Sequence, residues 1–434
     1  MKLGFIYRFL LLISLLVGNT TLFGWTNHFY GTYLSLEPLE EFKKQVVVES
    51  IESFLNKEGV ALADRLEEIE ALSKKEIKNY RPRPDSIKFN PSDKKNIRIN
   101  FLRAIRVNPT IKLALYYQEI PTKENLAKKS IPYTNVTIFD QDVGLKKYIL
   151  TELKENSTTS ALNVSSSAAD EPDYGIDIDL FDKGIEPDQK LSEWGKEYNF
   201  GAQAFGDPKY FYGTQAPFHM GFYHESFISY AAAGWIKNTY PDMRIFQFYH
   251  LAKFAFETGH DYWGYRFLGW ALHYIGDLTQ PYHSTLTPGI GTTRKIFAQI
   301  INKKKINEYR DRVSERHTAI EHYQFFIMRR DLGTNINSEL LTAYKNLDKD
   351  SKYKKFNTSS YIQSILTDES NDRASELDDL LDDNPEIMKF KEAKGSDLTV
   401  EPNEKTKATN EFLIDLFSSF GSHTRNFARA VLEK

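Results

Sequence analysis

Apolar residues recur at helical spacing along most of this chain, and no convincing run alternates as a β-strand does. Segment 39–80 has the spacing of two helices, and segments 98–118 and 296–330 each have the spacing of one helix. Three further segments are dense in aromatic residues on most sides, which predicts buried helices. They are 222–235, 246–256 and 262–278. The pattern therefore predicts an all-α fold, with these three helices at its centre.

Two polar segments interrupt this pattern. Segment 155–170 is rich in Ser, Thr, Asn and Ala, which is typical of a flexible loop or linker. Segment 348–408 is polar and charged, and we expect a surface insertion that is partly disordered. Residues 411–432 predict a closing helix, so a C-terminal β-sandwich for membrane docking is not expected. We therefore expect 25–434 to be a single all-α domain, a compact multi-helix bundle with two long insertions.

The N-terminus has the features of a signal peptide. Two basic residues precede the apolar run 9–17, which is too short for a comfortable membrane span, and Gly24 offers a small residue for cleavage. Removal of 1–24 would leave a secreted or periplasmic protein that begins at Trp25. An uncleaved N-terminal anchor is the alternative, and Leu22, where a smaller residue is usual, favours it.

Composition narrows the chemistry. The chain has 434 residues, 41% hydrophobic and 26% charged, and its formal charge of -3 gives no global basic field to recruit nucleic acid or an anionic membrane. It has no cysteine, which excludes disulfides, thiolate metal sites and cysteine nucleophiles. Any metal ion must therefore be held by His, Asp, Glu or backbone groups, a set that suits zinc.

The segment His273–His283 is the sharpest candidate for such a site. His273 and Asp277 are four residues apart, so they share one face of the predicted helix. An aspartate in so apolar a helix is costly unless a cation or a hydrogen bond compensates its charge. Pro281 ends the helix, and the following turn carries His283. This spacing fits a metal site. It fits equally a hydrogen-bonded His273–Asp277 pair in the core, in which case His283 has no part in it.

Other histidines are weaker candidates. His317 and Glu321 repeat the four-residue spacing, which solvated helix faces also show by chance. His219 opens the first aromatic helix. A neutral imidazole at a helix N-terminus is a good zinc ligand, but His219 could equally be an ordinary polar residue near a helix start. The remaining histidines are interpreted as structural or surface residues. They are His224, His250, His260, His322 and His423.

The pattern His273-x3-Asp277-x2-Gln280-Pro281-x-His283 resembles the signature of the bacterial zinc-dependent phospholipases C. It is similar also to that of the fungal single-strand nucleases of the same superfamily. The resemblance implies a mature N-terminal Trp with a nearby His, then an Asp followed by a His, and a His-x3-Glu pair after the signature. Matching residues occur in the implied order over roughly the first three-quarters of the chain. They are Trp25, His28, Asp173, His219, His317 and Glu321.

The resemblance also implies three zinc ions. The first would be held by Asp173, His219, His273 and Asp277. The second would be held by His283, His317 and Glu321. The third would lie between the Trp25 terminus, His28 and a bridging Asp277. Such a cluster can clamp phosphoryl oxygens and lower the pKa of a bound water, and Asp173 would orient that water as a catalytic base.

One departure from the family pattern leaves the first zinc site open. Asp173 and His219 are 46 positions apart (219 minus 173), where the family has them much closer, and Asp207 is a rival only 12 positions before His219. We favour Asp173 because its Pro-Asp-Tyr context resembles the family and an insertion can loop out at low entropic cost.

Three functions follow from these features. The first is a secreted phospholipase C-like phosphodiesterase that acts on phospholipid head groups, with transient contact to a membrane surface and no stable protein partner. The second is a secreted single-strand nuclease or nucleotidase on the same three zinc ions, which would need a basic groove with aromatic platforms. The third is a non-catalytic helical surface protein with vestigial metal sites, which the complete ligand set disfavours.

Overall fold

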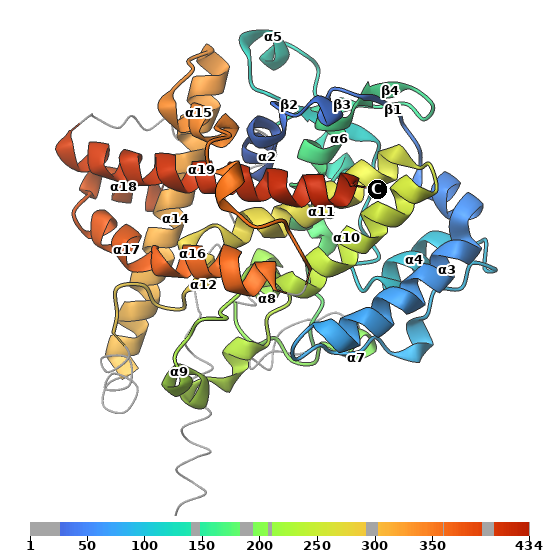
Figure 1. Cartoon of the computed structure of the whole chain (residues 1–434), viewed down its shortest axis with the longest axis horizontal. Helices are drawn as coiled ribbons and strands as arrows, with labels where there is room; N and C mark the ends of the chain where they lie inside the picture. The colour runs from blue at the N-terminus through green and yellow to red at the C-terminus, as the bar shows by residue number, and fades with distance from the viewer. Residues whose placement is uncertain are drawn as a thin grey trace, which may run out of the picture.

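The computed structural model describes residues 27–139, 148–182, 194–206, 211–291, 303–358, 360–392 and 403–433. This part of the chain is mostly helical, as predicted (Figure 1). Its longer helices are α2 (His28–Leu36), α3 (Ile51–Glu76), α4 (Ile97–Ala104), α6 (Ala161–Ala168), α10 (Pro241–Glu257), α11 (Asp261–Leu278), α14 (Lys303–Thr334), α17 (Ala374–Asp382) and α19 (Glu404–Leu432). Shorter helices are α5 (Lys123–Leu126), α7 (Trp194–Tyr198), α8 (Ala216–His219), α9 (Phe227–Ala232), α12 (Pro281–Ser284), α15 (Glu339–Lys345), α16 (Thr367–Asp372) and α18 (Pro385–Met388).

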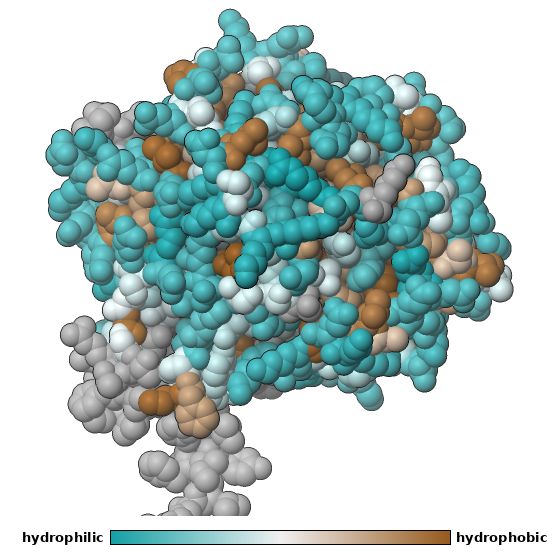
Figure 2. All heavy atoms as spheres, viewed as in Figure 1, coloured by the Kyte–Doolittle hydropathy of each residue, from teal (hydrophilic) through white to brown (hydrophobic). Residues whose placement is uncertain are grey.

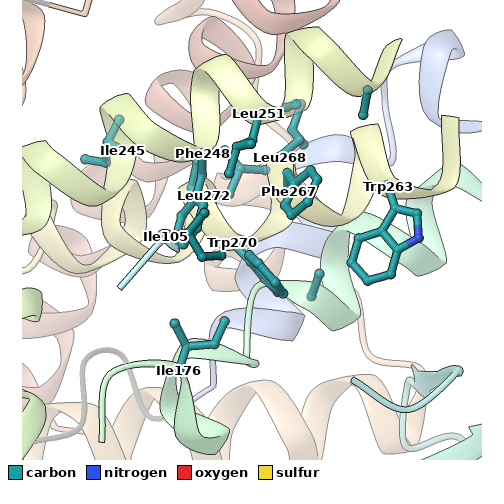
Figure 3. Close-up of a cluster of buried hydrophobic side chains, with 14 of the residues drawn as sticks. Ile105, Ile176, Ile245, Phe248, Leu251, Trp263, Phe267, Leu268, Trp270 and Leu272 are labelled. Atoms are coloured by element: carbon teal, nitrogen blue, oxygen red, sulfur yellow. The ribbon is translucent and has the colours of Figure 1, made fainter. Parts of the chain in front are cut away.

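Helix α11 lies at the centre of the molecule, surrounded by α2, α6, α10 and α19. Every residue from Tyr262 to Leu278 is buried. Figure 3 shows its side chains Phe267 and Trp270 packed in an apolar cluster with Phe248 of α10, whose ring lies edge-on to Trp270 at 5.1 Å. Truncating an aromatic residue in such a core costs about 3–5 kcal/mol. The two predicted buried helices 246–256 and 262–278 are confirmed as α10 and α11.

The prediction of a flexible loop at 155–170 is wrong, because strand β4 (Thr158–Ser160) and the largely buried helix α6 occupy the middle of this segment. The Ser160 hydroxyl caps it by accepting the Asn163 amide at 3.1 Å. Its small residues allow close packing on α11. A Cβ added at Gly269 would lie 2.4 Å from the Ser165 carbonyl oxygen. The Ser and Ala content that resembles a linker therefore serves a close helix–helix contact.

Two predicted helical segments have different boundaries. Segment 39–80 contains one long helix, α3, which begins after Ser50 and follows strand β1 (Gln45–Val47). In segment 98–118 the helix ends at Ala104, because Arg106 has a φ of 53° and cannot continue it, and β2 (Tyr116–Glu119) follows. β1 pairs antiparallel with β4 (Thr158–Ser160), and β2 with β3 (Ile149–Glu152).

The predicted aromatic helix at 222–235 is also wrong. The chain leaves helical geometry at Met220, and α9 begins only after Ser226, whose hydroxyl caps it. His219 is therefore the last residue of the four-residue helix α8 and does not open a longer one. The Gly221 amide donates to the His283 carbonyl at 2.9 Å, which ties this turn to α12.

The segment 348–392, expected to be part of a disordered insertion, is folded wherever it is described. Helices α17 and α18 bury Leu377, Ile387 and other apolar side chains, with α17 packed on α19 and α18 on α14. Two arginines of α14, Arg312 and Arg316, pair with Asp378 in its acidic stretch. Residues 393–402 lie outside the described ranges. The closing helix predicted at 411–432 is confirmed as part of α19.

The face of the molecule in Figure 2 is mostly hydrophilic, with apolar side chains in small scattered groups. Among the residues that the structure describes, none of the helices combines the length and apolar character that crossing a bilayer requires.

Candidate metal centre

Eight of the nine predicted ligand residues lie together at one buried place, beside the C-terminal half of α11. They come from segments spread over positions 28 to 321: α2, the turn after α6, α8, α11, α12 and α14. Trp25, the ninth, lies outside the described residues, as do residues 1–24 and Asp207. The centre contains three groups whose ligand atoms all lie within 4.8 Å of one another. The groups are His28, His273 and Asp277; Asp173, His219 and His273; and His283, His317 and Glu321.

Asp277 is the hub of this centre. Its Oδ2 lies 2.9 Å from His219 Nδ1 and 3.2 Å from His273 Nε2. Its Oδ1 lies 3.3 Å from His28 Nε2 and 3.4 Å from His283 Nδ1. Burial alone would favour the neutral acid, but the four imidazoles hold the pKa of Asp277 well below its usual range. One ionised carboxylate therefore faces ligand atoms on both sides, as a bridging ligand does.

Two histidines of the centre have their tautomer fixed by backbone carbonyls. Nδ1 of His273 lies 2.7 Å from the Ala169 carbonyl oxygen, and Nδ1 of His283 lies 2.9 Å from the His219 carbonyl oxygen. A neutral imidazole that donates its Nδ1–H to a carbonyl keeps a lone pair on Nε2. Both Nε2 atoms point into the ligand groups. Burial disfavours the charged ring of His273, yet Asp277 and Asp173 raise its pKa to about 9 in the protein alone.

The third group consists of His283, His317 and Glu321. The two Nε2 atoms are 3.0 Å apart, and His317 Nε2 lies 2.5 Å from Glu321 Oε1. Gln280 donates to the same Glu321 oxygen at 3.3 Å. Burial lowers the pKa of His283 to about 4 and that of His317 well below its usual value. Both rings are therefore neutral at pH 7, which is the state that binds a metal ion.

Several buried nitrogen and oxygen atoms of the centre have no hydrogen-bond partner among the described residues, and a bound cation would satisfy them. Neither ring nitrogen of His28 makes a hydrogen bond to a described residue, and Asp277 Oδ1 and His219 Nε2 have none either. Buried polar atoms without partners cost about 1–3 kcal/mol each, so they need an explanation. A metal ion satisfies imidazole nitrogens and carboxylate oxygens that crowd together without donors between them. The residues present therefore fit a bound metal ion.

Gly276 allows the elements to approach closely enough. A Cβ at this position would lie 2.9 Å from His28 Nδ1 and 2.8 Å from the Phe420 side chain. The absence of a side chain thus lets α11 contact both α2 and α19 beside Asp277.

Asp173 lies at the most exposed edge of the centre. It belongs to the short turn Pro172–Ile176, and its Oδ1 is 3.9 Å from both His219 Nδ1 and His273 Nε2. Gln215 donates to the same oxygen at 2.9 Å, which fixes the carboxylate. Asp173 is 7% exposed and His219 is 3% exposed, whereas the other six ligand residues are at most 2% exposed. Solvent therefore meets the centre first at Asp173.

Several supporting residues escaped the sequence analysis. Asp170 accepts the Phe29 amide at 2.9 Å and the Asn27 side chain at 3.1 Å, which holds the start of α2 in place. Burial raises the pKa of Asp170 to about 7. Asp177 lies behind His219, 3.7 Å from its Nε2. Both aspartates flank Asp173 closely in sequence, and that acidic spacing of 170, 173 and 177 was the available signal.

The five histidines predicted to lie outside the site belong to none of the ligand groups found among the described residues. His423, for example, contacts Glu369, and His260 lies between Glu49 and Glu58. Comparisons with family models, curated proteins and solved structures found no match for the chain.

Proposed function

We propose that this protein is a secreted zinc-dependent hydrolase of phosphate diesters that acts on phospholipid head groups. The observation that carries the proposal is the presence of three adjoining ligand groups. His273 belongs to two of them, and Asp277 Oδ1 lies 3.4 Å from His283 of the third. The resemblance to zinc-dependent phospholipases C supports it, since that family implies these groups in this order along the chain. The mostly helical arrangement around α11 is compatible with the fold of that family.

The choice of zinc rests on the donors. Five imidazoles and three carboxylates supply nitrogen and oxygen without any thiolate, a mixture that zinc accepts readily. Asp277, whose two oxygens face His219 and His273 on one side and His28 on the other, would be shared between two of the ions. His28 would bind the third ion together with the amino terminus at Trp25, so signal cleavage would be required for a complete centre. Zinc ions held here would polarise phosphoryl oxygens and lower the pKa of a water.

The residues of the chain then have distinct tasks. Asp173, at the exposed edge, accepts a proton from the attacking water and orients it toward phosphorus. Gln215 keeps the Asp173 carboxylate in place through its 2.9 Å hydrogen bond. The apolar surroundings of α11 exclude bulk water and strengthen the electrostatic interactions inside the centre. The Ala169 and His219 carbonyls keep Nε2 of His273 and His283 free to bind.

The test uses the full chain secreted from a host that processes signal peptides. We would measure its N-terminus by mass spectrometry, its zinc content, and its hydrolysis of phosphatidylcholine vesicles and of single-stranded DNA side by side. We expect a start at Trp25, close to three zinc ions per chain, and release of the phosphorylated head group. DNA cleavage without lipid hydrolysis would replace the lipid substrate by nucleic acid.

A matched pair of variants controls this test. Asp277→Asn removes the hub carboxylate, and Asp378→Asn removes a carboxylate that is equally buried. Asp378 groups only with two exposed aspartates, Asp379 and Asp382, and its charge is already compensated by Arg312 and Arg316. Zinc and activity should be lost only in the first. A zinc-free wild-type protein, or an Asp277→Asn variant with full activity, would overturn the proposal.

A further inference from the structure

A second buried carboxylate, Asp177, lies directly behind His219. It is fully buried, and its Oδ1 accepts a hydrogen bond from Nε of Arg244 at 2.9 Å. Its Oδ2 accepts the Tyr274 hydroxyl and lies 3.7 Å from His219 Nε2. The ligand groups do not include Asp177, so its contact with the centre runs through the His219 ring.

The two nitrogens of His219 face different surroundings. Nδ1 points into the centre, 2.9 Å from Asp277 Oδ2 and 2.9 Å from His273 Nε2. Nε2 points outward to Asp177 and makes no hydrogen bond to a described residue. A separation of 3.7 Å is longer than a hydrogen bond, and a shift of about 0.7 Å would close it to the ordinary range.

We propose that Asp177 is a positioning residue for His219. It would accept the Nε2–H of the neutral ring, and this would leave the Nδ1 lone pair directed at the metal ion. The inference rests on the proposed function in one respect, namely that a metal ion is the partner of Nδ1. His273 and His283 are held by neutral backbone carbonyls, whereas His219 would be held by a carboxylate. A carboxylate that accepts one ring N–H makes the other ring nitrogen more basic and therefore a stronger metal ligand.

The surroundings of Asp177 suit this task. Arg244 compensates its charge and is itself anchored, with donors 3.0 Å from the Ile105 carbonyl and 2.7 Å from the Arg106 carbonyl. Tyr274 comes from α11, one residue after His273, so the Asp177 carboxylate is fixed to the helix that carries the hub. Arg244 holds one oxygen of this carboxylate and Tyr274 holds the other, so the His219 ring would orient toward a fixed acceptor. The competing explanation is that Asp177 serves only as the counter-ion of Arg244.

The experiment compares Asp177→Asn with Asp378→Asn in the mature protein. Asp378 is a close match, since it is fully buried, pairs with Arg312 and Arg316, and accepts the Tyr282 hydroxyl at 2.9 Å. Zinc dissociation constants would be measured by competition with a chromophoric chelator, and folding by circular dichroism. We expect Asp177→Asn to weaken one zinc ion about 10- to 100-fold and to spare the others. Asp378→Asn should change none of them.

The second readout is the Nε2–H of His219 in the zinc-loaded protein, measured from its ring ¹H and ¹⁵N shifts. The zinc-loaded state is needed because Nδ1 lies 2.9 Å from Asp277 Oδ2, which would compete for the ring proton in the metal-free protein. A proton on Nε2 that is shared with a carboxylate should resonate downfield, and Asp177→Asn should move it upfield because a neutral amide is a weaker acceptor. The inference is overturned if Asp177→Asn keeps both this shift and the zinc affinities of the wild type. If that variant does not fold, a wild-type ring that binds zinc through Nε2 overturns it. A wild type that binds no zinc contradicts the proposed function, and with it the metal partner of Nδ1 on which this inference rests.

Discussion

The candidate metal centre differs from a second, partly buried cluster of histidine and carboxylate in how its polar atoms are satisfied. The α16–α19 cluster consists of Tyr353, Tyr361, Glu369, Ser419 and His423. There the Tyr361 hydroxyl lies 2.8 Å from His423 Nδ1, and His423 Nε2 lies 3.3 Å from Glu369. Hydroxyls of Ser419 and Tyr353 each donate to Glu369 at 2.7 Å. A neutral His423 can therefore accept on one side and donate on the other.

The candidate metal centre combines histidines and carboxylates without hydroxyls between them. Its imidazoles contact carboxylates or one another, as in the 3.0 Å contact between His283 and His317, and several of its atoms have no hydrogen-bond partner among the described residues. Acceptors and lone pairs thus accumulate around Asp277. Residue identity alone therefore does not mark a candidate metal site, because hydroxyl donors placed between the same residue types produce a closed hydrogen-bond network.

The largest expected effect is that of Asp277→Asn. Loss of the bridging charge should release the zinc ions that it joins and remove several kcal/mol of transition-state stabilisation. About 4 kcal/mol corresponds to a roughly thousandfold fall in kcat/KM. Zinc analysis and vesicle hydrolysis measure both. His423→Gln is the control from the other cluster, and it should retain its zinc.

Zinc should stabilise the folded protein only by binding at the candidate metal centre. A ligand present at about a thousand times its Kd stabilises the folded state by about 4 kcal/mol. We therefore expect the Tm of chelator-treated wild type to rise by several degrees when zinc is restored, and the rise to persist in His423→Gln. An equal rise in Asp277→Asn would show that the ions bind elsewhere.

Glu369→Gln should act through stability alone. It weakens the bonds from His423, Ser419 and Tyr353, which we expect to cost about 1–3 kcal/mol of unfolding free energy in a urea titration. Zinc content should stay at the wild-type value. A loss of zinc in Glu369→Gln would mean that the two clusters are coupled and do not act independently.

Gly276→Ala tests how tightly the centre is packed. The new methyl group would conflict with His28 and Phe420, and overpacking of this kind costs about 1–3 kcal/mol. Because His28 must move, we expect weaker binding of one zinc ion, measured by chelator competition. Gly234→Ala is a suitable control, since nothing lies within 4 Å of the added Cβ.

The smallest effect concerns pH. Burial disfavours the Glu369 carboxylate, but hydrogen bonds from His423, Ser419 and Tyr353 lower its pKa below the usual 4.5. A carboxyl whose pKa is lower in the folded state stabilises the fold above the unfolded pKa, and this contribution is lost as pH falls below about 4.5. One proton changes stability by no more than about 1.4 kcal/mol per pH unit. Compared with Glu369→Gln, the wild type should therefore lose stability more steeply between pH 4.5 and pH 3.5, measured by denaturant titration.

The predictable parts of the fold are those with local signals. Helix α11 has continuous apolar periodicity, and its His273–Asp277 spacing follows from helical geometry alone. Helix α6 was missed because its three serines and one asparagine favour helices less than alanine does, and its eight residues are too few to show clear apolar periodicity. Its stability comes from the contact with α11 at Gly269, which no local pattern contains.

The candidate site divides in the same way. The resemblance predicted which residues would form each ligand group, since His28, His219 and His317 have no spacing relationship to one another. Asp177 and Gln215 were not predicted, because they act on His219 and Asp173 from separate segments through tertiary contacts. Such supporting contacts depend on how the turn after α6 lies against α8.

The spread of the ligands over positions 28 to 321 has a consequence for how the chain reaches its native state. Contacts between residues so distant in sequence form late, because large loops must close before they contribute. Partly folded chains hold only fragments of the donor set, such as His273 with Asp277, and should bind metal weakly. Tight binding of the ions would then require that α2 and α14 have both packed onto the rest of the molecule. Metal added during refolding would therefore change the rate of the last folding step and not the rate of nucleation.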